Sequence, residues 1–294
     1  MLKPQGIITA LVTPFRESDE KIDYTALKNI IDIQCEAGVH GIFISGSTAE
    51  AYAMEPEEKR ELLQATKEYA AGRTQVFFGA GGNSTRQTID LVQIAEKEGA
   101  DAVSVITTYF ATPSQDELYG FYSDIAKSTS LPIIMYNHPL RTMVNISGST
   151  IGKLSKINNI VGVKDSSGNM NNSMDFIANT ERDFGVLSGN DSLILSLLDL
   201  GGSGAVSASA NFVPKLLVDM YKEYTSGNRE KAFELQMKLF AVRKLFNLGT
   251  YPAMIKDACR VMGIDMGICR RPVTGLSESD LCKLTETLKE AGQI

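Results

Sequence analysis

A lysine inside an apolar strand is the residue in this sequence whose type and position most clearly allow chemistry. The stretch 159–168 reads NIVGVKDSSG, with Lys164 directly after Gly162 and Val163. Side chains alternate along a strand, so Gly162 and Lys164 share one face. Burial disfavours the charged form of an amine, and the free amine attacks ketones. The alternative is a lysine that reaches out of the strand end or pairs with a carboxylate such as Asp165.

A tyrosine ends another apolar segment, LPIIMYNHPLRT at 131–142. Ile134 and Tyr136 share one strand face, and the Tyr136 phenol could exchange a proton with a bound substrate. Arg141 follows in a loop, where its guanidinium could clamp a carboxylate through two parallel hydrogen bonds. The alternatives are a tyrosine that only fills the core and an arginine that is a solvated loop charge.

A turn rich in hydroxyl groups follows a third apolar strand, in GIFISGSTAE at 41–50. Ser47 and Thr48, with the backbone N–H groups of the turn, could bind an anion such as a carboxylate without a basic side chain. The two hydroxyls could instead satisfy the backbone of the turn itself. Together, an amine for a ketone, hydroxyls for a carboxylate and a phenol for a proton suit a 2-oxo acid.

The elements that position these residues alternate between short apolar runs and amphipathic stretches with helical spacing. Continuous apolar strands that alternate with helices favour an α/β fold with a closed parallel (β/α)8 TIM barrel, and an open doubly wound sheet is the alternative. In such a barrel, strand parity predicts that Lys164 and Tyr136 both point to the inward face. Barrel enzymes carry their catalytic groups at the carboxyl ends of the strands, where Lys164 would lie. The expected strands are Gly6–Val12, Gly41–Ser45, Gln75–Gly79, Ala102–Thr107, Ile133–Tyr136, Ile160–Lys164, Gly185–Ser188 and Gly204–Ser207.

The pattern changes after Pro214, where only helical stretches follow. We expect residues 1–225 to form the barrel with the catalytic site. Residues 226–294 are expected to form a C-terminal helical extension packed on the barrel. No linker rich in proline, glycine or serine separates the two parts, which argues against independent domains.

Composition limits the classes of function. The 294 residues are 43% hydrophobic and carry a formal net charge of −6, so no basic face for nucleic acid is expected. No apolar run approaches the roughly 18 residues of a membrane span, and the N-terminus lacks a signal-peptide pattern, so we expect a cytoplasmic protein without membrane contact. The four cysteines form no CxxC pair and there are two histidines, so neither a metal site nor a zinc aldolase is expected.

Short motifs along the chain, including those quoted above, also resemble a known family. Read in order, ALVTPF, GSTAE, PSQDELY, YNHPLRT, GVKDSSGN, SGND, GAVSASAN and CRRPV are similar to the dihydrodipicolinate synthase and N-acetylneuraminate lyase family of pyruvate-dependent class I aldolases. The resemblance runs along nearly the whole chain. It implies that Lys164 forms a Schiff base with pyruvate and that Tyr136 relays protons. It also implies that Thr48 orients Tyr136 and that Ser47 and Thr48 supply a pocket for the carboxylate.

Further roles and partners follow from the same resemblance. Arg141 stands where the synthases bind the carboxylate of the incoming aldehyde, and Val206 where the family lines the pyruvate pocket. The family chemistry implies no metal and no external cofactor, a keto acid and an aldehyde as partners, and a homotetramer built as a dimer of dimers.

Four positions depart from the family pattern. Phe110 stands where the family usually has a tyrosine that completes the proton relay across a subunit interface. Ala49 replaces the usual glycine of the turn and would be strained if that position needed a positive φ. Ser192 replaces the sugar-binding glutamate of the sialic acid lyases. Gln87 replaces an acid that helps bind feedback lysine in some synthases.

From this resemblance, with Arg141 and PSQDELY, we expect a lyase that condenses pyruvate with aspartate semialdehyde. Cleavage of a 2-keto-3-deoxy sugar acid, or a related 4-hydroxy-2-oxo acid, to pyruvate and an aldehyde is the alternative. Two other classes stay open: a barrel that senses a keto acid without turnover, and a phosphate-binding or pyridoxal phosphate barrel that uses GGSGAVSASANF as its loop.

Overall fold

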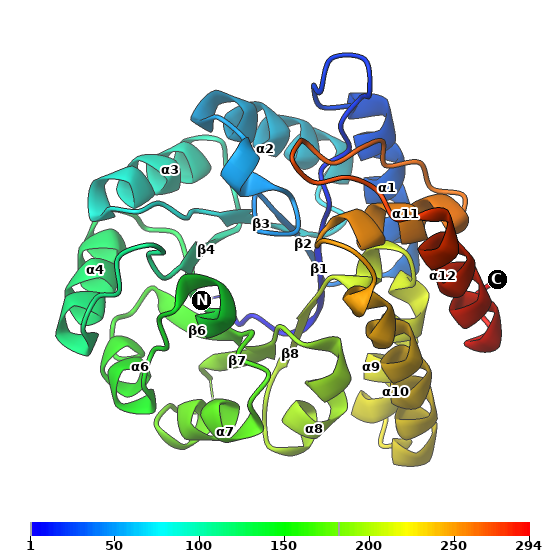
Figure 1. Cartoon of the computed structure of the whole chain (residues 1–294). Coiled ribbons are helices and arrows are strands. Elements are labelled where there is room, and N and C mark those ends of the chain that lie inside the picture. The colour runs from blue at the N-terminus through cyan, green and yellow to red at the C-terminus, as the bar shows by residue number, and fades with distance from the viewer. Residues whose placement is uncertain (1, 182) are drawn as a thin grey trace. The chain divides into compact units, whose positions relative to one another are not determined.

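Eight parallel strands follow one another in chain order around a closed barrel in this computed structural model, which describes residues 2–181 and 183–294 (Figure 1). This topology confirms the predicted (β/α)8 fold class and excludes the open doubly wound sheet. The strands are β1 (Gly6–Ala10), β2 (Gly41–Ile44), β3 (Gln75–Gly79), β4 (Ala102–Ile106), β5 (Ile133–Asn137), β6 (Ile160–Asp165), β7 (Gly185–Ser188) and β8 (Gly204–Ser207).

Helices alternate with the strands and continue beyond the last one. Those that follow strands are α1 (Tyr24–Ala37), α2 (Pro56–Ala70), α3 (Thr85–Lys97), α4 (Gln115–Lys127), α5 (Pro139–Thr142), α6 (Gly148–Leu154), α7 (Met170–Ala178), α8 (Ile194–Asp199) and α9 (Pro214–Thr225). The chain then continues in α10 (Arg229–Lys244), α11 (Ala253–Val261) and α12 (Glu278–Glu290). Short 3-10 turns are η1 (Ala51–Ala53), η2 (Asp191–Leu193), η3 (Ser209–Asn211) and η4 (Leu245–Asn247).

Local sequence signals explain where the longer helices begin and end. The Ser114 hydroxyl accepts a hydrogen bond from the Glu117 N–H, and the Glu117 carboxylate accepts one from the Ser114 N–H, which closes a capping box at the start of α4. The α2 helix begins with Pro56 in its first turn, where a missing N–H costs nothing. The α1 helix ends at Gly38, whose φ of +79° is the left-handed conformation that glycine adopts freely.

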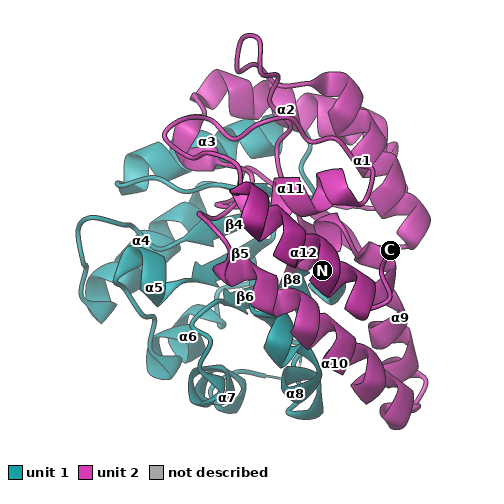
Figure 2. Ribbon diagram, turned by 45° about the vertical axis from the view of Figure 1, so that its right-hand side comes forward, with its two compact units in different colours: residues 1–6, 76–206 teal, residues 7–75, 207–294 magenta. Residues whose placement is uncertain are grey.

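The chain divides into two compact units, coloured separately in Figure 2. Unit 1 comprises residues 1–6 and 76–206 and carries β4 to β7 with the helices from α3 to α8. Unit 2 comprises residues 7–75 and 207–294 and carries β2, α1, α2 and the helices from α9 to α12. Within unit 2, α10 packs along α9, which ends at Thr225 (Figure 1). The division into residues 1–225 and 226–294 stays a prediction.

Two glycines in unit 1 give room to the N-terminal segment. A Cβ atom on Gly162 would lie 2.8 Å from Pro4 Cγ and 2.6 Å from the Gly185 carbonyl oxygen. A Cβ atom on Gly185 would lie 2.5 Å from Pro4 Cγ. Because a real Cβ does not approach other atoms so closely, both positions need glycine. Pro4 therefore packs against the β6 and β7 backbone at the end of the strands away from Lys164.

Candidate active site

Lys164 lies near the carboxyl end of β6 and is 4% exposed. A lysine that reached out of the strand end into solvent would be largely exposed, so that alternative is wrong. Strand β6 extends one residue beyond the predicted end, to Asp165, and β5 likewise extends to Asn137. These two added residues pair in register, and the Asn137 side-chain amide donates to the Asp165 carboxylate at 3.1 Å.

The Asp165 carboxylate is occupied by uncharged donors. Besides Asn137, it accepts hydrogen bonds from the Ser167 N–H and hydroxyl at 3.0 Å each, from the Asn172 amide at 3.2 Å and from the Ser173 hydroxyl at 2.7 Å. Several donors satisfy a buried carboxylate without a cation. Asp165 therefore anchors the β6–α7 turn directly after Lys164.

Tyr136 and Lys164 face each other across neighbouring strands. Their Cα atoms are register partners in the β5–β6 pair, and the Lys164 Nζ lies 4.1 Å from the centroid of the Tyr136 ring. Both side chains are 4% exposed. Residues that pair in register point to the same face of a sheet, which agrees with the shared face predicted for these two residues. An amine and a phenol thus meet in a site largely closed to solvent.

The same face continues across β7 and β8. Lys164 pairs with Leu187, and Leu187 pairs with Gly204. Val206 lies two residues after Gly204, so its side chain shares their face, and it is buried. The structure therefore brings Val206 to the sheet face that carries Lys164. Leu187, an apolar neighbour on this face, had no motif that could have singled it out.

Two side chains that follow β5 are those of His138 and Arg141. The His138 ring centroid lies 5.7 Å from that of Tyr136, and its Nδ1 has no hydrogen-bond partner among the described residues. Burial, the Lys164 charge and then the Arg141 charge lower the pKa of His138 to about 4. Arg141, which was expected in a loop, lies instead in the one-turn helix α5, which begins at Pro139, and it is exposed. Its charge is thus close enough to act on a ring beside Tyr136.

The hydroxyl turn lies in unit 2, after β2. The Gly46 carbonyl accepts hydrogen bonds from the N–H groups of Ala49 and Ala51, both at 3.1 Å. A Cβ atom on Gly46 would lie 2.7 Å from the Phe43 ring, so this position needs glycine. The left-handed backbone of this region falls on Ser45 (φ 55°) and Glu50 (φ 60°). The strain considered for Ala49 is therefore absent, because Ala49 does not have a positive φ.

The two hydroxyl side chains of the turn differ in burial. Thr48 is buried and Ser47 is half-buried. The Thr48 hydroxyl forms a short hydrogen bond with the phenol of Tyr251, which precedes α11. The hydroxyl of Thr48 thus has a side-chain partner rather than only the backbone of its own turn. Tyr251, like Leu187, is a residue near a predicted site residue that the sequence analysis missed.

A buried ion pair joins the end of this turn to α11. The Lys256 Nζ lies 2.7 Å from the Glu50 Oε1, and the two side chains are 2% and 0% exposed. The Arg270 N–H donates to the Glu50 Oε2 at 2.8 Å. Breaking a buried ion pair costs several kcal/mol because one charge is left without a partner. The turn that carries Ser47 and Thr48 is therefore fixed to the C-terminal segment.

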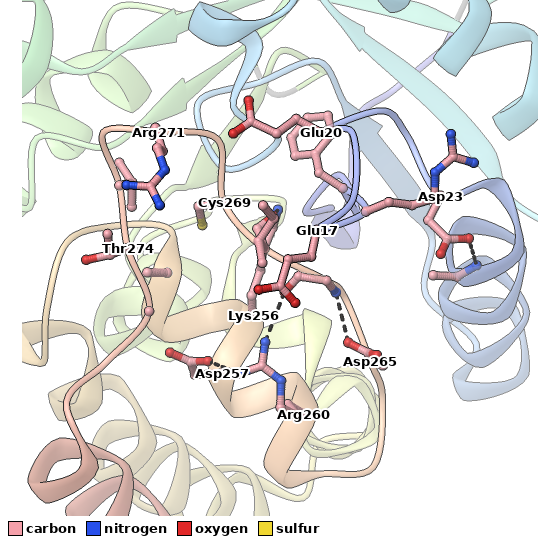
Figure 3. Close-up of a pocket in the computed structure, with 18 of the residues that line it drawn as sticks. Glu17, Glu20, Asp23, Lys256, Asp257, Arg260, Asp265, Cys269, Arg271 and Thr274 are labelled. Atoms are coloured by element: carbon pink, nitrogen blue, oxygen red, sulfur yellow. Dashed lines mark hydrogen bonds and ion pairs between the residues drawn. The ribbon is translucent and has the colours of Figure 1, made fainter.

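A large cavity of about 1360 Å³ in unit 2 is lined in part by Lys256 of this ion pair (Figure 3). Its wall includes Lys256 and Cys269, whose thiol pKa burial raises to about 12. The cavity is also lined by Asp257 and Arg260, which form an ion pair with each other. None of the sequence-predicted site residues lines it. Within residues 2–181 and 183–294, no group of three His, Cys, Asp or Glu side chains could hold a metal ion.

Comparisons with known proteins extend these observations. The model of the dihydrodipicolinate synthetase family matches residues 3–291. The 4-hydroxy-tetrahydrodipicolinate synthase of Methanococcus maripaludis strain C6 is 38% identical over 289 residues, which cover 98% of this chain and 99% of that protein.

Solved structures agree with the sequence comparison. The dihydrodipicolinate synthase from Thermotoga maritima is 35% identical, with a TM-score of 0.96 and full coverage of both chains. A prophage protein of the dihydrodipicolinic acid synthase family from E. coli K12, solved in complex with pyruvate, is 29% identical, with a TM-score of 0.95 and 99% coverage of both chains. With a family match along nearly its whole length, the chain belongs to the dihydrodipicolinate synthetase family.

Proposed function

We propose that this protein is a class I aldolase that condenses pyruvate with aspartate semialdehyde, as a 4-hydroxy-tetrahydrodipicolinate synthase. The observation that supports this proposal most directly is the buried Lys164 amine. Its Nζ lies 4.1 Å from the Tyr136 ring centroid, at the carboxyl end of the barrel strands. Relatives at 36–38% identity across nearly the whole chain are named as this synthase, which supports the choice of reaction.

The first half of the reaction uses the amine. The neutral Lys164 Nζ attacks C2 of pyruvate, and the resulting carbinolamine loses its hydroxyl group as water to leave a protonated imine. This cation withdraws electrons from C3, so C3 loses a proton and an enamine forms. Tyr136 is the proposed proton donor and acceptor for these steps, because its phenol shares the sheet face of Lys164.

The second half forms the carbon–carbon bond. Enamine C3 attacks the aldehyde carbon, and the aldehyde oxygen takes a proton. The amino group of the aspartate semialdehyde portion then attacks C2 of the imine and displaces the Lys164 amine, which closes the ring of the product and frees the enzyme. In this proposal Ser47 and Thr48 hold the carboxylate of pyruvate, Val206 lines the pyruvate pocket, and Arg141 binds the carboxylate of aspartate semialdehyde. Lysine supplies the electron sink here, so the scheme uses neither a metal ion nor an external cofactor.

Steady-state turnover tests this assignment. The purified protein is supplied with pyruvate and aspartate semialdehyde in one assay and with 2-keto-3-deoxygluconate in the other. The proposal expects kcat/KM for the condensation to exceed that for sugar-acid cleavage by at least about 100-fold, the scale of specificity that pocket contacts provide. Faster cleavage of the sugar acid would instead make this chain an aldolase of the alternative substrate class.

The proposed state of the chain is a homotetramer, a dimer of dimers, in the cytoplasm. In support, Phe110 is fully exposed in the single chain, and Leu140 and Met143 are about three-quarters exposed. All three follow the carboxyl ends of neighbouring strands, β4 and β5, and large exposed apolar side chains often mark an interface. Sedimentation of Phe110→Ala at micromolar concentration tests the interface: the proposal expects smaller species than the wild type.

No helix in the described part of the chain is long and apolar enough to cross a membrane.

A further inference from the structure

In unit 2, the Thr48 hydroxyl and the Tyr251 phenol form a hydrogen bond to which the proposed function gives no role. The two residues are 203 positions apart in sequence, and Thr48 is buried. Two hydroxyl groups this far apart in sequence form a hydrogen bond only if the surrounding structure holds both groups in place.

Contacts made by the residues around Thr48 and Tyr251 supply that support. Two residues after Thr48, Glu50 forms its ion pair with Lys256, which lies five residues after Tyr251. One residue after Thr48, the Ala49 carbonyl accepts a hydrogen bond from the Thr13 hydroxyl at 2.9 Å. The Tyr251 ring also packs near Phe246, with centroids 6.2 Å apart. The distance between the phenol and the hydroxyl is thus fixed by several contacts that do not involve either group.

The direction of the hydrogen bond follows from the chemistry of the partners. A threonine hydroxyl has one proton to donate and lone pairs to accept with, and a phenol is the better donor of the two. A carboxylate only accepts hydrogen bonds, so a hydroxyl that holds one must donate to it. If Tyr251 donates to the Thr48 oxygen, the Thr48 proton is left for the carboxylate.

We infer that Tyr251 is a positioning residue that acts through Thr48, holding the hydroxyl of Thr48 as a donor to the carboxylate of pyruvate. This inference rests on the proposed function, which gives Thr48 to that carboxylate. Tyr251 touches no reacting atom in this scheme. Its loss should therefore weaken the binding of pyruvate more than it slows the chemistry.

Tyr251→Phe removes the phenol oxygen and keeps the ring, so it is the variant that tests the inference. We expect KM for pyruvate to rise about 5- to 20-fold, the scale of one hydrogen bond, with kcat at saturating pyruvate changed less than about threefold. Tyr24→Phe is the matched control, because its phenol also loses a hydrogen bond, to Glu61, in the same unit. KM in this control should stay at the wild-type value.

A double-mutant cycle with Thr48 separates action through Thr48 from a structural role. In the Thr48→Val background, Tyr251→Phe should have no further effect on KM, whereas in the Thr48→Ser background its effect should return. An equal rise in KM with valine or threonine at position 48, or no rise at all, would overturn the inference.

Covalent trapping distinguishes a failure of the proposed function from a failure of the role inferred for Tyr251. With borohydride and saturating pyruvate, Tyr251→Phe should still gain the mass of a pyruvyl adduct. The pyruvate concentration that gives half-maximal trapping should rise by the same factor as KM. If the wild type gained no adduct, the proposed function would have failed first. An adduct in both proteins with the same dependence on pyruvate would reject only the role of Tyr251.

Discussion

The Nζ atom of Lys164 lies 4.1 Å from the centroid of the Tyr136 ring, and the two residues are register partners on β5 and β6. The strand pairing itself sets this approach, because paired residues point to the same face and no loop has to close for them to meet. Sites built on strands hold their groups more firmly than sites on loops. The amine and the phenol are therefore positioned before any substrate arrives.

Tyr136→Phe tests whether that phenol moves protons. The ring stays, so packing against Lys164 is preserved, while the group that donates and accepts the proton is lost. We expect kcat to fall about 10²- to 10⁴-fold, the usual contribution of a positioned acid or base. Borohydride trapping over time is the second measurement, and the adduct should form more slowly. A variant with wild-type kcat would show that Tyr136 only fills the core.

Arg141→Ala tests recognition of the second substrate. The exposed guanidinium is proposed to bind the carboxylate of the aldehyde, and a charged hydrogen bond contributes about 1.5–3 kcal/mol. We expect KM for aspartate semialdehyde to rise about 10- to 100-fold while KM for pyruvate stays constant. A rise in KM for pyruvate alone would place Arg141 at the other end of the site.

Lys256→Met tests the buried ion pair with Glu50. Methionine fills a similar volume but leaves the Glu50 carboxylate buried without its cation, which should cost about 3–5 kcal/mol of unfolding free energy. Adding Glu50→Gln removes that charge and should recover most of the loss. Denaturant unfolding of the single and double variants gives the comparison. Equal destabilisation of both would mean that packing, rather than charge, dominates this contact.

His138 should make the protein less stable in mild acid. Its pKa is lowered from 6.5 to about 4, first by burial and then by the Lys164 charge. Between these two pH values the unfolded chain binds a proton that the folded chain does not, so stability falls as pH drops through this window and the contribution is constant below it. We expect about 1–2 kcal/mol to be lost, allowing for partial exposure of the ring.

His138→Asn removes this titration and gives the comparison. Its unfolding free energy should change less than that of the wild type between pH 6.5 and 4. His40, whose pKa burial also lowers, contributes in the same direction in both proteins and cancels in the difference. Parallel pH profiles for the two proteins would contradict the assignment to His138.

The sequence predicted the barrel and the strand ends closely because apolar runs, glycines and helix caps are local signals. Lys164 and Tyr136 were predicted to share a face from strand parity, and the register confirms it. The one-residue extensions to Asn137 and Asp165 come from the pairing of these two residues in register, which a hydrogen bond between their side chains accompanies and no local pattern reveals.

Contacts between segments far apart in the chain could not be predicted from the sequence. Tyr251 belongs to no motif that indicates a site. Its phenol contacts the Thr48 hydroxyl only because the C-terminal segment packs against the turn after β2. The left-handed backbone of that turn falls on Glu50, where the buried ion pair with Lys256 holds it, and not on Ala49. Both outcomes depend on tertiary contacts that override local preference.

Borohydride reduction in the presence of pyruvate, followed by intact-mass and peptide mass spectrometry, tests the central claim most directly. Lys59→Ala is the matched control for Lys164→Ala, since Lys59 is another buried lysine, and burial lowers the pKa of its own amine. The account predicts one pyruvyl adduct on Lys164 in the wild type and in Lys59→Ala, and none in Lys164→Ala. An adduct that persists in Lys164→Ala, or none in the wild type, would contradict a Schiff base at Lys164.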